Sequence, residues 1–330
     1  MTLHSTETRP PEATAPPAPD ATAEVAPAAA AAPTEPSMVR AGVRSFFRNR
    51  NNVIACAIMV PLVSIALLSP WLPLGNLTQS NLLASLAPPS LEHPFGTDKL
   101  GRDILARTFA GLRISILVGL AAATISLLGG MIIGTLAATL GKRVDAAVSS
   151  LVDVLMAFPA VLMAIVIVAV FGPGPVQLII ALGIASMPAA IRLQRSLALS
   201  IVSSTYMDAA RMANASAWWN VRRHMLPNSV APMMVVASIY AAEAILAEAA
   251  LSFLGLGVVP PTPSLGNIIA DGQNYLREAW WISTIPGLTI VLLSLSLHFF
   301  SDGVREQLDP ALRATVMRAR KERRWMRRSR

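Results

Sequence analysis

Six long hydrophobic blocks constrain the fold of this 330-residue chain more than any other feature. An α-helix rises ~1.5 Å per residue, so about 20 apolar residues cross the ~30 Å hydrocarbon core of a bilayer. Only 14% of the residues are charged, whereas soluble domains average about 25%. We therefore predict an all-α polytopic membrane protein with six transmembrane helices. The predicted spans are residues 53–74, 114–140, 146–171, 176–197, 229–254 and 282–300.

The basic residues around these blocks indicate which loops face the cytoplasm. Lys and Arg are enriched in the cytoplasmic loops of membrane proteins and set their orientation. Arg40, Arg44, Arg48 and Arg50 precede the first block, and ten of the 27 Lys and Arg residues follow residue 301. We therefore predict that both termini are cytoplasmic. Because the charge follows the spans, the net charge of +8 indicates contact with the lipid bilayer and no nucleic-acid partner.

The composition divides the chain into four regions. Residues 1–37 are rich in Ala and Pro and cannot bury a core, so we expect a disordered cytoplasmic tail. Residues 38–113 hold the first span and an external loop. Residues 114–301 form a five-helix core that includes the cytoplasmic loop 205–228, and residues 302–330 form a strongly basic cytoplasmic tail.

Two stretches, residues 75–113 and 255–281, are predicted to lie outside the membrane and to be rich in turns. Asp103 is placed to begin an interfacial helix that leads into the second span. Trp280 and Trp281 lie where an aromatic belt would meet the membrane surface.

Glycines in the second predicted span indicate close helix packing. Gly119, Gly129, Gly130 and Gly134 include pairs at helical spacing. Small residues at such positions let the backbones of two membrane helices approach each other.

The chain carries no recognisable catalytic machinery. It has no Walker A loop, no HExxH or GxSxG motif and no dinucleotide-binding glycine fingerprint. Its one cysteine, Cys56, lies within an apolar block, and its four histidines are scattered without ligand spacing. We therefore predict no catalytic residue, no metal site and no cofactor bound by this chain. A transport role would have to run on an ion gradient, on passive conduction or on another subunit.

Two acidic residues, Glu243 and Glu248, lie inside the fifth block. An acid at the centre of a bilayer costs at least about 2.5 kcal/mol, so both are candidates for an intramembrane function. Five residues apart on a helix, they point about 140° away from each other and do not share a face. Each is either a functional group or a packed group that hydrogen-bonds a neighbouring helix.

The loop 205–228, TYMDAARMANASAWWNVRRHMLPN, resembles the coupling-loop signature of bacterial ABC-importer permeases. That signature reads EAA, three residues, Gly, nine residues and then I-x-L-P. Here Asp stands for Glu, Asn for Gly and His for Ile, and Asn readily adopts the left-handed conformation found where a helix turns. The resemblance implies that this loop couples the chain to an ATPase. The candidate coupling residues are Tyr206, Asp208, Ala209, Ala210, Asn214, His224, Leu226 and Pro227.

Four other stretches look like the C-type permease of dipeptide/oligopeptide importers, and the resemblance covers about residues 40–315. It implies the type I ABC-importer permease fold, a location in the bacterial cytoplasmic (inner) membrane, and inward transport of di- or oligopeptides by alternating access. The implied partners are a B-type permease subunit, one or two ABC ATPase subunits that bind ATP and Mg, and an extracytoplasmic solute-binding protein. The stretches are HPFGTDKLGRDILAR (93–107), AEAALSFLGLGVVPPTPSLGN (247–267), ADGQNYL (270–276) and SDGVREQLDPALR (301–313).

The residues of the loop suggest how it would act. Residues 206–213 favour a short helix, and Asp208 lies near its start, where the helix dipole favours negative charge. Pro227 is expected to break the chain's helix before the fifth span. A short helix held between two spans can dock in a groove of an ATPase and move both spans with it.

Two other functions fit six spans. A secondary transporter or channel acting alone would show internal repeats and midplane charges. No convincing repeat is visible, and only Glu243 and Glu248 could supply such charges. A membrane scaffold without a transport role is the other possibility. The substrate is also open, because related permeases serve dipeptides, oligopeptides, glutathione, nickel chelates and other small solutes; we expect di- or oligopeptides.

Overall fold

The protein is described here by a computed structural model that covers residues 46–308, with the exception of residues 48, 73–76 and 78. The predicted tail 1–37 lies outside the described residues, as does most of the predicted basic tail.

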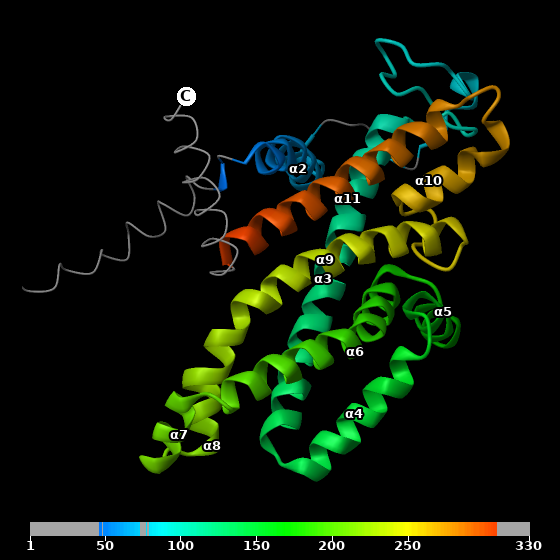
Figure 1. The fold of residues 1–330 in the computed structure, drawn as a ribbon. Coiled ribbons are helices and arrows are strands. Elements are labelled where there is room, and N and C mark those ends of the chain that lie inside the picture. Colours follow the sequence, from blue (N-terminus) through cyan, green and yellow to red (C-terminus); the bar gives the residue numbers. More distant parts are fainter. Residues whose placement is uncertain (1–45, 48, 73–76, 78, 309–330) are drawn as a thin grey trace, which may run out of the picture. The chain divides into compact units, whose positions relative to one another are not determined.

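The described part of the chain is helical and contains no β-strand (Figure 1). Five helices are long and apolar enough to cross a membrane, and a bent pair, α4 with α5, makes up to six. This agrees with the six predicted spans. The helices are α2 (Arg50–Leu68), η1 (Leu82–Ala84), α3 (Ile104–Thr139), α4 (Lys142–Met156), α5 (Ala160–Phe171), α6 (Pro175–Val202), α7 (Thr205–Met212), α8 (Ala217–Asn220), η2 (Val221–Met225), α9 (Leu226–Phe253), α10 (Leu265–Gly272), η3 (Gln273–Tyr275) and α11 (Trp281–Leu308).

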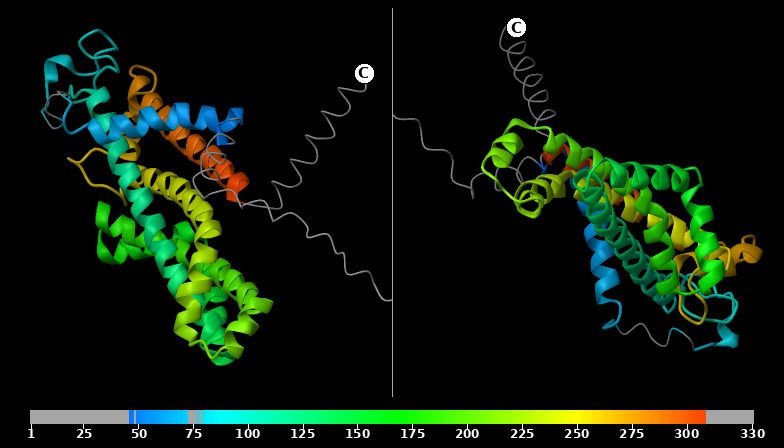
Figure 2. Two further views of the ribbon diagram at one scale, coloured as in Figure 1. Left: turned by 90° about the vertical axis from the view of Figure 1, so that its left-hand side faces the viewer. Right: turned by 90° about the horizontal axis from the view of Figure 1, so that it is seen from below.

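Helix α3 is the element against which the others pack. It contacts α2, α4, α6, α9, α10 and α11, most extensively α6 and α9 (Figures 1 and 2). The predicted interfacial helix and second span are one continuous helix. As predicted, Asp103 begins it: its carboxylate accepts a hydrogen bond from the backbone N–H of Ala106 at 2.9 Å.

Glycines allow α3 to lie unusually close to α6 and α9, as their spacing predicted. A β-carbon on Gly130 would lie 2.5 Å from the β-carbon of Ala190, and one on Gly134 would lie 2.7 Å from the carbonyl oxygen of Ile191. Gly119 stands in the same relation to α9, where a β-carbon would lie 2.5 Å from a side-chain carbon of Ile245. Van der Waals contact and close backbone approach, rather than hydrophobic exclusion of water, hold helices together in lipid.

The third predicted span is not one straight helix. Helices α4 and α5 meet at 89°, and Pro159 lies at the break, where it caps α5 and has no N–H to continue the backbone ladder of α4. Ion pairs hold α4 against α6: the carboxylate of Asp145 accepts from Arg195, one N···O distance being 2.7 Å, and Asp153 accepts from Arg192.

The loop before α3 and the helix α10 are joined at one end of the helices. Asp98, almost fully buried, accepts from Arg102 at 2.6 Å, and Arg102 reaches Asp271 of α10 at 3.4 Å. Trp281 is 6% exposed, and its indole N–H donates to the carbonyl of Thr97 at 3.1 Å. The expectation that Trp281 faces a lipid interface was therefore wrong, because this loop covers the ring.

The start of α2 and the end of α11 lie next to each other. The side-chain amide of Asn49, just before α2, donates to the carboxylate of Glu306 in α11 at 3.0 Å. Helix α11 runs to Leu308, so the region predicted as a tail from residue 302 begins inside a helix.

The glycine contacts lead to a test of the packing. Replacing Gly130 by Ala should lower the thermal midpoint in detergent by an amount equivalent to roughly 1–3 kcal/mol, because the new methyl group meets α6. Gly287→Ala in α11 is the matched control, since the nearest atom to its new methyl group, Cδ1 of Ile269, would be 4.0 Å away. Equal midpoints for the two variants would contradict the close packing of α3 on α6.

Candidate functional site

The segment between α6 and α9 forms a compact helical turn that projects from the ends of these two long helices (Figure 1). Its first part is α7, Thr205–Met212, so the predicted helix over residues 206–213 is confirmed to within a residue at each end. Met207 is 2% exposed and anchors α7, whereas Met212 is 84% exposed.

Asn214 ends this helix in the conformation that its sequence position predicted. Its φ is +58°, in the left-handed region. The N–H of Asn214 bonds to the carbonyl of Arg211 at 2.9 Å, and the N–H of Ala215 bonds to that of Ala210 at 3.1 Å. These two bonds form a Schellman motif, in which Asn takes the place usually held by Gly. The turn therefore needs no glycine to reverse the chain.

The other predicted residues of α7 form its outer surface. Asp208 and Ala209 are exposed, and Ala210 is half-buried. Arg211 donates to Asp208 at 2.9 Å and to the carbonyl of Val202 in α6 at 3.2 Å, which ties α7 to the end of α6.

His224 brings the two halves of the segment together. Its ring lies between the rings of Tyr206 in α7 and Trp219 in α8, with centroid distances of 5.6 and 5.0 Å. Offset or edge-to-face aromatic pairs contribute about 0.5–1.5 kcal/mol each. The predicted residues Tyr206 and His224 are thus in contact, and Trp219 is a member of the site that the signature did not indicate.

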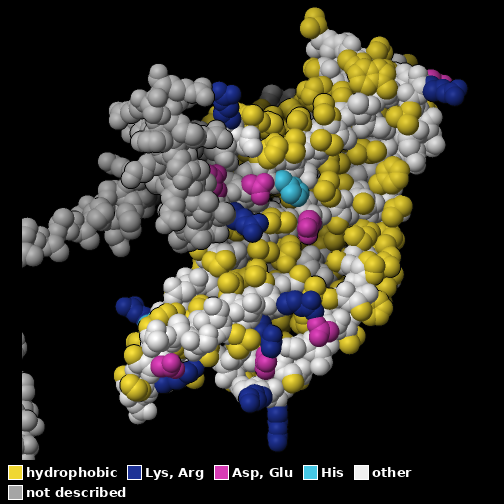
Figure 3. Space-filling view, in the orientation of Figure 1, with side chains coloured by type: hydrophobic (Ala, Val, Ile, Leu, Met, Phe, Trp, Pro, Cys, Tyr) yellow, Lys and Arg dark blue, Asp and Glu magenta, His cyan; other side chains and the backbone are white. Residues whose placement is uncertain are grey.

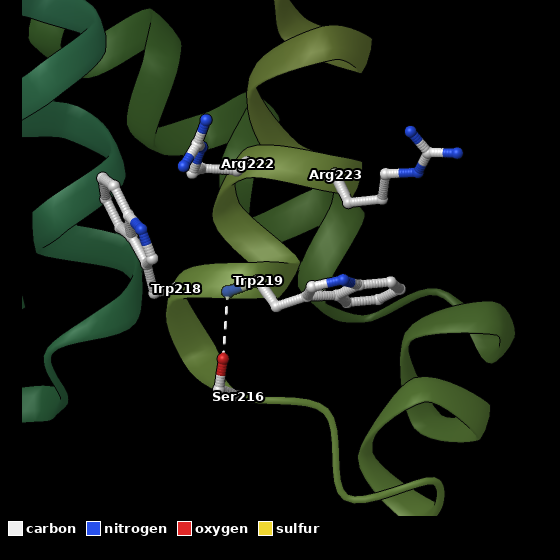
Figure 4. A pocket seen from close by; sticks show the side chains of 5 residues that line it. All are labelled: Ser216, Trp218, Trp219, Arg222 and Arg223. Atoms are coloured by element: carbon white, nitrogen blue, oxygen red, sulfur yellow. Dashed lines mark hydrogen bonds between the residues drawn. The ribbon is translucent and has the colours of Figure 1, made fainter.

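A shallow hollow of about 410 Å³ opens on the outer side of this segment and is lined by Ser216, Trp218, Trp219, Arg222 and Arg223 (Figure 4). The guanidinium carbon of Arg222 lies 5.9 Å from the Trp218 ring centroid, within cation–π range. Ser216 caps α8 by accepting from the N–H of Trp219 at 3.2 Å. The Trp-Trp pair in a polar stretch was the sequence signal that could have identified this surface.

Pro227 does not break the helix before the fifth span, contrary to our expectation. The chain is one continuous helix over Ala217–Phe253, because Val221–Met225 form a π-helical turn. In that turn the N–H of Leu226 bonds to the carbonyl of Val221, five residues back. The wider turn accommodates the proline ring, and the amide of Asn228 donates to the carbonyl of His224 at 2.7 Å. Leu226 and Pro227 therefore join the segment to α9.

A buried polar node links three helices just above the segment. The amide of Gln194 in α6 is fully buried and donates to Thr135 of α3 at 2.9 Å and to Ser229 of α9 at 3.0 Å. Val221 and Met225 pack against α6 in the same region. No local sequence pattern indicates this node, because its three members are far apart in the chain.

The two intramembrane acids have different environments. Glu248 is fully buried and accepts from Ser115 of α3 at 2.5 Å and from Ser252 at 2.8 Å. Ser252 also accepts from the N–H of Val258, in the loop after α9, at 3.1 Å. Glu243 is exposed. Neither acid therefore lies in the segment between α6 and α9. Glu248 connects α9 to α3 through its hydrogen bond with Ser115.

Within the described residues, no three His, Cys, Asp or Glu side chains are grouped so that they could hold a metal ion.

Comparison with known proteins agrees with these features. Residues 130–314 match the family described as "Binding-protein-dependent transport system inner membrane component". The chain is 41% identical to a putative peptide transport system permease protein of Brucella abortus, over 86% of this chain and 98% of that protein. It is 38% identical to the di/tripeptide transport system permease protein DppC of Pseudomonas aeruginosa (84% and 94% covered). It is 37% identical to the dipeptide transport system permease protein DppC of Escherichia coli K12 (81% and 91% covered).

The aromatic contacts of His224 can be tested directly. His224→Ala should speed amide hydrogen exchange in residues 205–220, because α7 loses its contact with Trp219 through the imidazole. His224→Phe keeps a ring of similar size and should exchange like the parent chain. Unchanged amide hydrogen exchange in the alanine variant would show that the contacts of His224 with Tyr206 and Trp219 do not hold the segment together.

Proposed function

Because this chain belongs to the family of binding-protein-dependent transport system inner membrane components, we propose that it is the C-type permease subunit of an ATP-driven ABC importer that carries di- or oligopeptides inward. The observation that carries the proposal is the segment 205–228, a packed helical turn with an exposed outer face between two membrane-crossing helices. The family and its named relatives favour a transport subunit, and nothing in them favours a transporter that works alone.

The coupling residues divide the work between contact and support. Tyr206, Asp208 and Ala209 supply the exposed face that docks on an ATPase subunit, and Ala210 lies at its edge. The other residues give this face its shape. Asn214 forms the left-handed turn, and His224 contacts the ring of Tyr206. Leu226 and Pro227 join the segment to α9.

Movement of the segment reaches the bilayer through the two long helices that flank it. Helix α9 continues from the segment without a break, and α6 is tied to it by Arg211. Gln194 then links both helices to α3. Closure of the ATPase subunits on ATP would move α3, α6 and α9 as one unit and switch access to the path from one side of the membrane to the other.

The remaining components follow from this assignment. ATP and Mg are bound by the separate ATPase subunits, one or two per complex, and this chain contributes no cofactor site. A B-type permease subunit completes the path, and an extracytoplasmic solute-binding protein delivers the peptide. Both termini are cytoplasmic, which is supported by the contact of Asn49 with Glu306, since it puts the ends of α2 and α11 on the same side.

A bulky side chain on the outer face of α7 tests the docking role. Ala209→Trp and Asp208→Trp should lower ATP-dependent dipeptide uptake into membrane vesicles at least tenfold, because the indole prevents close contact with the ATPase groove. The same variants should lose ATPase subunits during affinity purification in mild detergent. Both positions are exposed, so folding and membrane insertion should be unchanged.

Leu91→Trp is the matched control, because Leu91 is fully exposed on the loop before α3, at the opposite end of the helices. Its uptake and subunit recovery should equal those of the parent chain. Full uptake by both α7 variants would refute the docking assignment.

The transmission role of Gln194 makes a separate prediction. Gln194→Leu preserves side-chain volume but removes both hydrogen bonds to α3 and α9, so the complex should hydrolyse ATP while transporting several-fold fewer peptides per ATP. Gln177→Leu, the same change near the start of α6 and away from the node, is the control. An equal transport-to-hydrolysis ratio in the two variants would show that the node does not transmit movement.

A further inference from the structure

Helix α9 carries one acid that the fold does not use. Glu248 is enclosed by α3 and by the loop after α9, and both of its carboxylate oxygens accept hydrogen bonds. Glu243, five residues earlier, is exposed, and among the described residues it has no hydrogen bond or ion pair within normal distance. The packing of this chain therefore leaves its carboxyl group available to something outside the chain.

Between Val236 and Ala250, Glu243 belongs to a stripe of α9 in which Tyr240 is the one other polar side chain within about 60° and the remaining members are apolar. At 100° per residue, Val236, Ile239, Leu246 and Ala250 lie within about 60° of it around the helix axis. An isolated acid on a lipid-facing stripe is strongly unfavourable, and such residues in membrane proteins face a bundle interior or a water-filled path. This stripe of α9 therefore faces water or a partner rather than lipid.

Other charged groups share this side of the molecule. Figure 3 shows acidic, basic and histidine side chains gathered on one face, over α4 and α6 and between α9 and α11, on a surface that is otherwise largely hydrophobic. Asp153 of α4 and Arg192 of α6 form an ion pair whose side chains are 67% and 51% exposed. Exposed ion pairs on helices that cross a membrane require hydration, so this face lines an aqueous path.

Helix α11 packs against α9 and carries a histidine at about the level of Glu243 along the helix axis. The hydroxyl of Ser301 donates to that of Ser238 at 2.8 Å and fixes the register of the antiparallel pair α9 and α11. His298 lies one turn before Ser301, so this register places it near the turn of α9 that carries Glu243. The side chain of His298 is half-buried, and its Nδ1 is bonded to the carbonyl of Ser294 at 2.9 Å, which fixes the ring.

The chemistry of this wall selects one feature of the cargo. An apolar wall does not distinguish among peptide side chains, but a single carboxylate attracts a cation, and its attraction is strong where the local dielectric constant is low. Every free peptide carries an α-ammonium group whatever its sequence. A contact with that shared group lets one path accept many peptides.

We propose that Glu243 lines the translocation path and binds the α-ammonium group of the peptide in transit. This inference rests on the proposed peptide-import function. It assigns the two acids of α9 to different tasks, Glu248 to helix packing and Glu243 to the cargo.

Thiol labelling in the assembled importer tests the position of this residue. In a Cys56→Ser background, Glu243→Cys should react with trimethylammonium-ethyl methanethiosulfonate, a membrane-impermeant cation, and the rate should differ between nucleotide-free and ATP-bound complexes. A saturating peptide should slow the reaction. Glu248→Cys is the control, since that position is fully buried and should stay unlabelled.

Uptake tests the role of the charge. With the solute-binding protein present, Glu243→Gln should lower dipeptide uptake per assembled complex about tenfold or more, because the amide cannot neutralise the ammonium group. Glu243→Asp keeps the carboxylate and should retain most of the uptake. The amount of assembled complex should be the same for both variants.

Three results would overturn the inference. The first is the absence of Glu243→Cys labelling in every nucleotide state, and the second is wild-type uptake by Glu243→Gln. The third is a loss of assembled complex in Glu243→Gln with normal uptake per complex, which would place Glu243 against the partner permease. If the Glu243→Cys complex is labelled and the parent complex hydrolyses ATP but imports no peptide, the proposed cargo is refuted instead.

Discussion

The close approach of α3 to α6 is the contact on which the rest of the helical unit depends. In lipid, backbone groups are satisfied within each helix, and association of helices relies on contact between their surfaces. Gly130 and Gly134 remove the side chains that would hold the two axes apart, so the backbone of α6 lies against that of α3. Gly119 does the same toward α9. Three helices are thereby brought within hydrogen-bonding reach of one another.

That proximity makes the two buried polar nodes possible. Gln194 joins α6 to α3 and α9 near the coupling segment, and Glu248 joins α9 to α3 near the opposite end. A buried polar group is stable only when it has partners, and each node has at least one partner from a different helix: Thr135 and Ser229 for Gln194, and Ser115 for Glu248. The nodes therefore require the glycine-mediated packing and in turn fix how the helices are rotated about their axes. Glu243 is on the side of α9 that neither node occupies.

Features with a local cause could be predicted from the sequence. Hydropathy located the spans, the carboxylate of Asp103 began α3, and the tolerance of Asn for a left-handed backbone placed the turn at Asn214. Features that depend on distant residues could not be predicted. Trp281 is covered by a loop whose Thr97 is far away in the chain, and α4 is held against α6 by two arginines that lie 39 and 50 residues later in the chain than their aspartate partners.

The candidate site shows the same division. The signature identified Tyr206, Asp208 and His224, but the edge-to-face contact of His224 with Trp219 and the node at Gln194 arise only when the segment folds. Pro227 was misjudged for another reason. A proline normally stops a helix, and the π-turn that accommodates it leaves no recognisable pattern in the residues around it.

The continuous helix Ala217–Phe253 has a mechanical consequence. Its 37 residues form one curved helix, with the segment between α6 and α9 at one end and the Glu248 node near the other (Figures 1 and 2). A helix that pivots near the Glu248 node behaves as a lever arm. A displacement of a few ångströms at the segment then changes the tilt of every turn between the segment and this node. Glu243 lies on this helix close to the node, where its side chain would move only a short distance but would still change its orientation. A displacement of the segment at one end of the helix would thus become a smaller change in the orientation of the side chains near its other end.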